Sequence, residues 1–300
     1  MMKSSTKTKK LLFVGGDLRQ IRAINEASKL GNTVYALGFG GECTQKLWED
    51  VRIIDDFSES DDTYHAVVLP LPYTTDGKSL NTPLFERKIM LTEVFENISP
   101  KNKVLAGRCD ARIKTMAETH GITLVDYSCR EELAMLNAVP TAEGAIQIAM
   151  EETPFTLHAS NCLVIGCGRI GKILSKMLDG IGAKVTVSAR KNRDLAYGMA
   201  MGFETVPISQ LSGEIGKFDI IFNTVPSMIL DFDLLSKISK KTLIIDLASK
   251  PGGVDFDEAR RRGIKVIWAL SLPGKVAPNT AGDIICSTIF NILEEMEMNG

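Results

Sequence analysis

The sequence has few histidines and no cysteine or histidine cluster, which excludes several kinds of site. Its six cysteines are scattered and form no CxxC pair, so neither a metal site nor a paired redox motif is indicated. They are typical of reduced thiols in a cytoplasmic protein. The three histidines, His65, His120 and His158, form no recognisable pair, and at each position an ordinary boundary histidine is favoured over a catalytic one.

Strong net charge and long apolar runs are also missing. A net charge of −2 over 300 residues argues against a protein that binds nucleic acid or a membrane surface. No stretch approaches the roughly 18 apolar residues of a membrane span, and the run LLFV behind the charged start is too short for a signal-peptide core. The hydrophobic content of 44% supports a large core, and the length favours two domains.

Short apolar segments alternate with amphipathic ones along the chain. The expected elements are strands at 10–14, 33–37, 51–54, 66–69, 103–106, 123–126, 162–165, 184–189, 219–223, 242–246 and 265–269, and helices at 19–30, 85–97, 111–120, 131–152 and 283–297. This alternation predicts an α/β fold of two doubly wound, Rossmann-like parallel-sheet domains with a cleft between them.

The same pattern suggests domain boundaries. We expect an N-terminal substrate-side domain over residues 1–136, an interdomain helix and linker over 137–158, and an NADP-binding domain over 159–278. Residues 279–300 would form a C-terminal helix that packs back on the first domain. We expect Pro140 to interrupt the linker helix, because proline removes a helical hydrogen bond.

A glycine motif follows the strand at 162–165. Gly166, Gly168 and Gly171 have the GxGxxG spacing, with Arg169 and Ile170 opening a helical pattern behind them. The first glycine permits a tight turn, the second a close approach of backbone to a pyrophosphate, and the third close packing of helix on strand. Cofactor binding is therefore favoured over a bare structural turn.

The residues after the next strand select the nucleotide. Ser188, Ala189 and Arg190 end that strand, with Arg190 nineteen residues past Gly171, and the first acid is Asp194. An acid at this place suits the ribose hydroxyl of NAD, whereas arginine suits the 2′-phosphate of NADP. NADP is therefore favoured, with NAD as the alternative and a solvated surface turn as the ordinary reading of these cations.

Ligands in open α/β sheets bind beyond the carboxyl ends of the strands. In the second domain this places a nicotinamide ribose and ring beside two loops, made of Asn223, Thr224, Val225 and Pro226 and of Leu247, Ala248 and Ser249.

Substrate candidates lie at the corresponding edge of the first domain and beside Pro140. Arg19 and Arg108 could each hold a carboxylate by a bidentate fork, or pair with a nearby aspartate at the surface. Asn137, Thr141 and Glu143 flank the proline.

Four segments together resemble the A-subunit of bacterial dipicolinate synthase: VGGDLRQ at 14–20, NAVPTAEGAIQ at 137–147, DLASKPGG at 246–253 and LSLPGKVAPNTAG at 270–282. The resemblance covers essentially the whole chain. The nucleotide domain is also similar to that of D-2-hydroxyacid dehydrogenases, which use a histidine from the segment after it. This chain has no histidine after His158, which weighs against hydroxy-acid chemistry.

The resemblance implies oxidation of dihydrodipicolinate to pyridine-2,6-dicarboxylate with a nicotinamide cofactor, in the mother cell of a sporulating bacterium, beside a flavoprotein-like B-subunit. The product ring is aromatic, so positioning can supply most of the catalysis. Arg19 and Arg108, with Lys250 or Lys275, are the candidates for holding two carboxylates, and Glu143 and Asp246 for the base.

Two other functions are compatible with the residues. One is an NAD(P)-dependent reductase of another small acid. The other is a non-catalytic nucleotide-binding role in a complex, because fold does not imply function. Apolar faces near 134–139 and 290–298 could pack within the chain, which is the default, or in a homo-oligomer.

Overall fold

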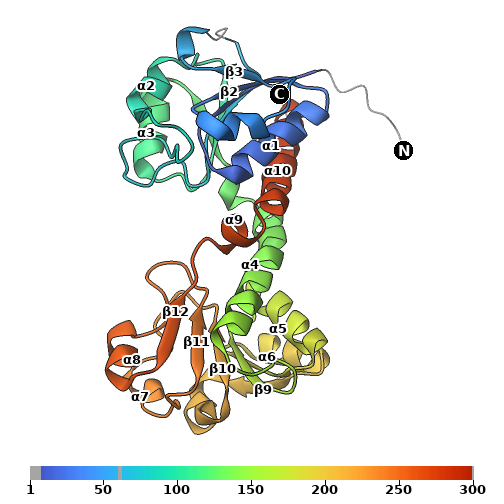
Figure 1. The fold of residues 1–300 in the computed structure, drawn as a ribbon, viewed down its shortest axis with the longest axis vertical. Coiled ribbons are helices and arrows are strands. Elements are labelled where there is room, and N and C mark those ends of the chain that lie inside the picture. The colour runs from blue at the N-terminus through green and yellow to red at the C-terminus, as the bar shows by residue number, and fades with distance from the viewer. Residues whose placement is uncertain (1–7, 60–62, 299–300) are drawn as a thin grey trace, which may run out of the picture. The chain divides into compact units, whose positions relative to one another are not determined.

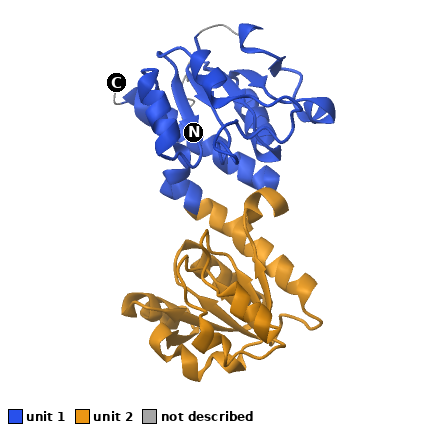
Figure 2. Ribbon diagram, turned by 90° about the vertical axis from the view of Figure 1, so that its left-hand side faces the viewer, with its two compact units in different colours: residues 1–134, 277–300 blue, residues 135–276 orange. Residues whose placement is uncertain are grey.

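The computed structural model describes residues 8–59 and 63–298, so the last two residues of the expected C-terminal segment lie outside it. The chain divides into two compact units, coloured separately in Figure 2. Unit 1 comprises residues 1–134 and 277–300, and unit 2 comprises residues 135–276. Each unit holds a six-stranded sheet, and among the described residues all strand pairs within the two sheets are parallel. The predicted fold class, two Rossmann-like α/β domains, is confirmed.

Unit 1 orders its strands β3-β2-β1-β4-β5-β6. Its elements are β1 (Lys10–Val14), α1 (Leu18–Lys29), β2 (Thr33–Leu37), β3 (Arg52–Ile54), β4 (Ala66–Val68), α2 (Leu91–Glu96), β5 (Lys103–Ala106), α3 (Ala111–Thr119), β6 (Thr123–Asp126) and α10 (Pro278–Met298), with short stretches of 3₁₀ helix at Gly41–Lys46, Phe57–Glu59 and Tyr127–Cys129.

Alternation along β1 builds the two cores of unit 1. Leu11 and Phe13 pack on one face with α1 and α10, which lie side by side in Figure 1. Leu12 and Val14 face the other way, into a core that includes side chains of α2 and α3. Successive side chains of a strand point to opposite faces, so a strand that is apolar throughout specifies a sheet covered on both sides.

Unit 2 repeats this topology with the order β12-β11-β10-β7-β8-β9. Its elements are α4 (Glu131–Glu152, which begins in unit 1), β7 (Asn161–Ile165), α5 (Arg169–Ile181), β8 (Lys184–Ala189), α6 (Asn192–Ala200), β9 (Glu204–Pro207), β10 (Ile220–Asn223), α7 (Phe232–Leu235), β11 (Leu243–Asp246), α8 (Phe256–Arg262), β12 (Lys265–Trp268) and α9 (Leu272–Val276), with 3₁₀ helix at Ile208–Gly213 and Ile215–Lys217.

Strand β9 was not expected, and three of the expected elements differ from the prediction. The helix expected over 85–97 is shortened to α2, because the chain before it is held as a loop by a bridge between Ser79 and Met90. Pro140 does not interrupt α4; the Thr141 hydroxyl instead donates to the Asn137 carbonyl at 2.7 Å. The C-terminal helix starts earlier, at Pro278, because proline suits the first helical turn, where its missing N–H is not needed.

Candidate functional site

A pocket of about 290 Å³ opens at the carboxyl ends of β7, β8 and β10 in unit 2. The sheet order reverses direction between β7 and β10, which is the place where doubly wound sheets bind ligands. The lining residues are Gly166, Cys167, Gly168, Ala189, Arg190, Lys191, Asp194, Ile208, Thr224, Val225, Pro226, Ser227 and Ile229.

The three glycines of the motif have separate structural reasons. Gly166 has φ +101, and a Cβ there would lie 2.3 Å from the Thr224 Oγ1. A Cβ at Gly171 would lie 2.1 Å from the Gly166 carbonyl oxygen, so this glycine lets α5 pack on β7. A Cβ at Gly168 would meet no protein atom within 4 Å. Gly168 therefore leaves open space in front of the turn.

The start of α5 supplies the donors for an anion in that space. Gly168 is the N-cap residue and has no side chain to bond the first turn. The first N–H groups of a helix have no acceptor within that helix, and the helix dipole favours negative charge there. A phosphate beside Gly168 would thus find both backbone donors and room.

The end of β8 places two cations and one acid at the pocket. Arg190 and Lys191 are exposed and line it together with Asp194. The Asp194 carboxylate lies 3.4 Å from the Arg193 guanidinium, which does not line the pocket. Ser188 is fully buried, and its Oγ has no hydrogen-bond partner among the described residues. Ser188 is not among the residues that line the pocket.

Side-chain hydrogen bonds of Asn223 and Thr224 shape the loop after β10. The Asn223 side chain is fully buried, donates to the Val225 carbonyl at 3.0 Å and accepts from the Val225 N–H at 3.2 Å. Thr224 is anchored to β7 by its hydroxyl, which donates to the Ile165 carbonyl at 2.9 Å. Asn223 thereby presents Thr224, Val225 and Pro226 to the pocket without lining it.

Asp246 completes this support from β11. Its carboxylate is fully buried and accepts from Asn223 Nδ2 at 2.8 Å, the Ala248 N–H at 3.1 Å and the Gly253 N–H at 2.9 Å. All its partners are N–H donors, so the carboxylate acts as an acceptor only. This arrangement favours a positioning role for Asp246. The predicted Leu247, Ala248 and Ser249 follow it in the β11 loop and do not line the pocket.

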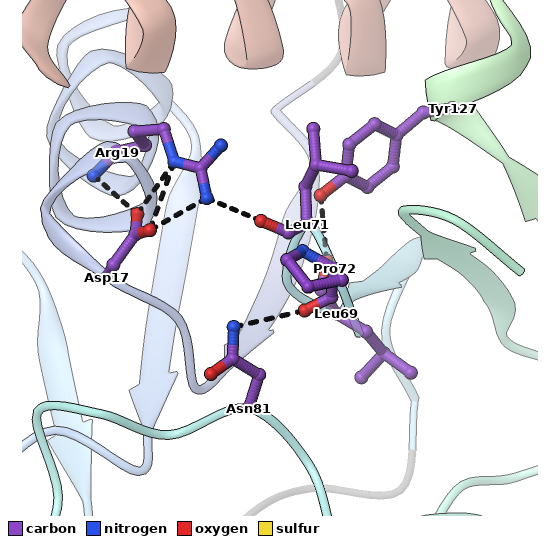
Figure 3. Close-up of polar contacts among 7 residues, drawn as sticks. All are labelled: Asp17, Arg19, Leu69, Leu71, Pro72, Asn81 and Tyr127. Carbon is purple, nitrogen blue, oxygen red and sulfur yellow. Dashed lines mark hydrogen bonds and ion pairs between the residues drawn. The ribbon is translucent and has the colours of Figure 1, made fainter. Parts of the chain in front are cut away.

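At the corresponding edge of unit 1, several side chains donate hydrogen bonds to loop carbonyls, as Figure 3 shows. The Arg19 side chain, 14% exposed, forms an ion pair with Asp17 at 2.7 Å and donates from Nη2 to the Leu71 carbonyl. Neighbouring carbonyls are also bonded: that of Leu69 accepts from the Tyr127 hydroxyl at 3.1 Å, and that of Pro72 from Asn81 at 3.2 Å. Arg19 thus supports the loop after β4.

Arg108 differs from Arg19 in its exposure and in the hydrogen bonding of its guanidinium. Its side chain is exposed, and within residues 8–59 and 63–298 no hydrogen bond or ion pair engages its guanidinium. Its φ is +62, a left-handed conformation that is uncommon for residues other than glycine. Of the two predicted arginines, Arg108 is the one available to an anion.

The remaining predicted residues fall on α4 and on loops of unit 2. Glu143, Lys250 and Lys275 are not buried. The Asn137 Oδ1 is buried without a partner among the described residues, while the Thr141 hydroxyl is used within the helix. No group of three or more metal-ligating side chains occurs in the described ranges.

Comparison with known proteins identifies the family. Residues 10–128 match the model of the N-terminal domain of the dipicolinate synthase A-subunit. The chain is 34% identical to the dipicolinate synthase A-subunit of Bacillus subtilis (strain 168) over 292 residues, which cover 96% of this chain and 97% of that protein. The chain belongs to the dipicolinate synthase A-subunit family.

Solved structures of dipicolinate synthase A-subunits agree with this assignment. The Bacillus halodurans protein is 33% identical with a TM-score of 0.87, over 95% of this chain and 97% of that chain. The Bacillus subtilis protein is 31% identical with a TM-score of 0.88, over 98% of both chains. The predicted resemblance to the dipicolinate synthase A-subunit family is confirmed.

Outside this family, the likeness is to dehydrogenases. Residues 147–267 match the model described as shikimate / quinate 5-dehydrogenase. The transhydrogenase of Sinorhizobium meliloti is 14% identical with a TM-score of 0.73, over 95% of this chain and 94% of that chain, which supports the fold alone. No helix in the described part of the chain is both long and apolar enough to cross a membrane.

Several residues of the site were not among the predicted ones. Cys167, Lys191, Asp194, Ile208, Ser227 and Ile229 line the pocket. Lys191 and Asp194 adjoin Arg190 in sequence, so extending the motif by one helical turn would have included them. Nothing in the local sequence marks Ile208, because it follows β9, a strand that was not expected.

Proposed function

We propose that this chain is the A-subunit of a dipicolinate synthase and oxidises dihydrodipicolinate to pyridine-2,6-dicarboxylate with NADP. The observation that carries the proposal is the open space at Gly168, in front of the α5 N-terminus. It occurs in a chain whose alignment with the Bacillus subtilis A-subunit covers 97% of that protein's length. We further propose that the chain acts in the cytoplasm of the mother cell of a sporulating bacterium, with a flavoprotein-like B-subunit as its partner.

The lining residues fit NADP part by part. Gly166, Cys167 and Gly168, with the first N–H groups of α5, would hold the pyrophosphate. Arg190 and Lys191 would hold the 2′-phosphate by charge-assisted hydrogen bonds. The loop from Thr224 to Pro226 would contact the nicotinamide ribose. When bound, the cofactor would supply a hydride acceptor.

The reaction removes two hydrogens from neighbouring ring atoms. One leaves as a hydride and the other as a proton, and the electron pair of the second bond completes the aromatic ring. The exposed Arg108 would hold a substrate carboxylate by a bidentate fork. Glu143, a carboxylate on the surface of α4, would accept the proton. Asp246 would act through Asn223 rather than on the substrate.

Nucleotide titration tests the cofactor part directly. We expect NADP to bind more tightly than NAD, and Arg190→Asp to weaken NADP binding by about ten- to a hundredfold, because a charge-assisted hydrogen bond is worth roughly 1.5–3 kcal/mol. Arg193→Asp is the matched control, since Arg193 is 77% exposed and lies outside the pocket lining. Equal NADP binding by Arg190→Asp and wild type would contradict the proposed phosphate contact.

A non-catalytic role is the second candidate, and the engagement of Asp246 favours it, because one of the two predicted bases is already bonded to three N–H donors. The variant Glu143→Gln separates the two functions. A large loss of kcat with unchanged NADP affinity supports catalysis with Glu143 as the base. Unchanged turnover would show that Glu143 is not the base.

A further inference from the structure

The exposed guanidinium of Arg108 stands on a backbone that is fixed from two sides. Arg108 follows β5 and has φ +62. An unfavourable backbone conformation persists only where the surrounding structure over-determines it, and such residues cluster at functional sites. The loops on either side of Arg108 provide that determination.

The first support comes from the loop after β4. The Gly107 N–H donates to the Pro70 carbonyl at 3.1 Å, and the Gly107 carbonyl accepts from the Tyr73 N–H at 2.9 Å. A Cβ at Gly107 would lie 2.7 Å from the Leu71 Cβ and 2.9 Å from its Cα. The two segments therefore touch backbone to backbone, which leaves residue 108 little freedom.

The second support comes from Asp126 and Ser128, at the end of β6 and just after it. The Arg108 N–H donates to the Asp126 Oδ1 at 3.2 Å and to the Ser128 Oγ at 2.9 Å. The Cys109 N–H donates to the other carboxylate oxygen at 2.8 Å. The Ser128 hydroxyl donates to Asp126 Oδ1 at 2.6 Å, so the two side chains act as one acceptor unit.

We infer that Asp126 and Ser128 are positioning residues for Arg108, and that they hold its backbone in the left-handed conformation so that its guanidinium meets a carboxylate of the substrate. This inference rests on the proposed function. Neither side chain contacts the substrate itself. The Asp126 and Ser128 oxygens accept hydrogen bonds from the N–H groups of Arg108 and Cys109. The Arg108 side chain is therefore left free for the anion.

A nearby aspartate provides the control for local damage. Asp110 also receives backbone and side-chain donors, from the Ile113 N–H at 3.1 Å and the Tyr73 hydroxyl at 2.8 Å. It lies two positions after Arg108 but accepts no hydrogen bond from it. Asp110→Asn therefore disturbs the same loop without touching the Arg108 backbone.

The test is a double-mutant cycle on the binding of pyridine-2,6-dicarboxylate to the full chain saturated with NADPH. We expect Asp126→Asn and Ser128→Ala each to weaken diacid binding, by about tenfold for Asp126→Asn, and Arg108→Ala by at least as much. In the Arg108→Ala background neither substitution should weaken binding further. A purely structural role would lower affinity equally in both backgrounds, and Asp110→Asn should leave it unchanged.

The outcomes separate the inference from the proposed function. Wild-type affinity in both Asp126→Asn and Ser128→Ala, or the same loss in both backgrounds, overturns the positioning inference alone. No diacid binding by the wild-type chain, with NADPH bound, overturns the proposed function and the inference with it. If Asp126→Asn does not fold, Ser128→Ala carries the cycle.

Discussion

Gly168→Ala separates a glycine needed for a ligand from a glycine needed for the fold. The backbone of Gly168 has φ −84 and ψ −160, which any residue can adopt, and a Cβ there would meet no protein atom within 4 Å. The substitution therefore costs only the difference between glycine and alanine as N-cap residues, from a few tenths to about 1 kcal/mol. We expect a cooperative thermal transition close to that of the wild type.

The same methyl group would occupy the place proposed for the pyrophosphate. We expect NADP affinity to fall by at least about tenfold, or roughly 1.4 kcal/mol, measured by calorimetric titration of NADP into the purified chain. One added carbon should thus reduce NADP binding strongly and stability only slightly.

Two glycines of the same helix serve as controls. A Cβ at Gly171 would lie 2.1 Å from a backbone oxygen, so Gly171→Ala should destabilise unit 2 by about 1–3 kcal/mol. A Cβ at Gly180 would meet nothing within 4 Å, so Gly180→Ala should gain up to about 1 kcal/mol of helix propensity and bind NADP normally. Wild-type NADP affinity in Gly168→Ala would refute the placement of the pyrophosphate.

Three further predictions concern stability. Asp246→Asn should lower the free energy of unfolding by about 3 kcal/mol, because an amide NH₂ in place of one carboxylate oxygen leaves a buried N–H donor, of Asn223 or of Gly253, without its acceptor; thermal melting with no change would contradict the positioning role. Arg108→Gly should raise the free energy of unfolding by up to about 1 kcal/mol, because glycine relieves the left-handed backbone. Ala159→Gly, at φ +63, should do the same, but only Arg108→Gly should impair diacid binding. A destabilised Arg108→Gly would contradict the presence of backbone strain at this residue. Burial raises the pKa of Cys286 to about 12, above that of a thiol in the unfolded chain, about 8.5. The unfolded chain therefore loses this proton first, and the free energy of unfolding should fall as the pH rises above about 9, a fall that Cys286→Ala should reduce in urea titrations at several pH values.

The fold could be predicted because its signals are local and repeated. Strands such as Lys10–Val14 are apolar along almost their whole length, which is typical of parallel strands buried on both faces. The strand Glu204–Pro207 was missed because it lies at the edge of its sheet and is only partly buried. A short edge strand with a glutamate and a proline carries little of the pattern that marks a central strand.

The candidate site could be predicted only where chemistry and backbone geometry coincide. Gly166 and Gly171 are needed because each packs against backbone or a fixed side chain, and their spacing is visible in the sequence. The sequence did not show that the Arg19 side chain is bonded whereas that of Arg108 is exposed. This difference depends on contacts with residues far along the chain, Leu71 for Arg19 and Asp126 for Arg108. Sequence places an arginine at a sheet edge, but tertiary contacts decide whether it is free.

We propose a hydride transfer from dihydrodipicolinate to NADP on this chain. The most direct test is to follow NADPH absorbance and pyridine-2,6-dicarboxylate together, with freshly prepared dihydrodipicolinate and NADP, using the purified chain with and without the B-subunit. We expect the two products to form in equal amounts, and Gly168→Ala to form much less of both at a subsaturating NADP concentration. Formation of the diacid without NADPH, or at an undiminished rate in Gly168→Ala, would contradict hydride transfer to NADP in this pocket.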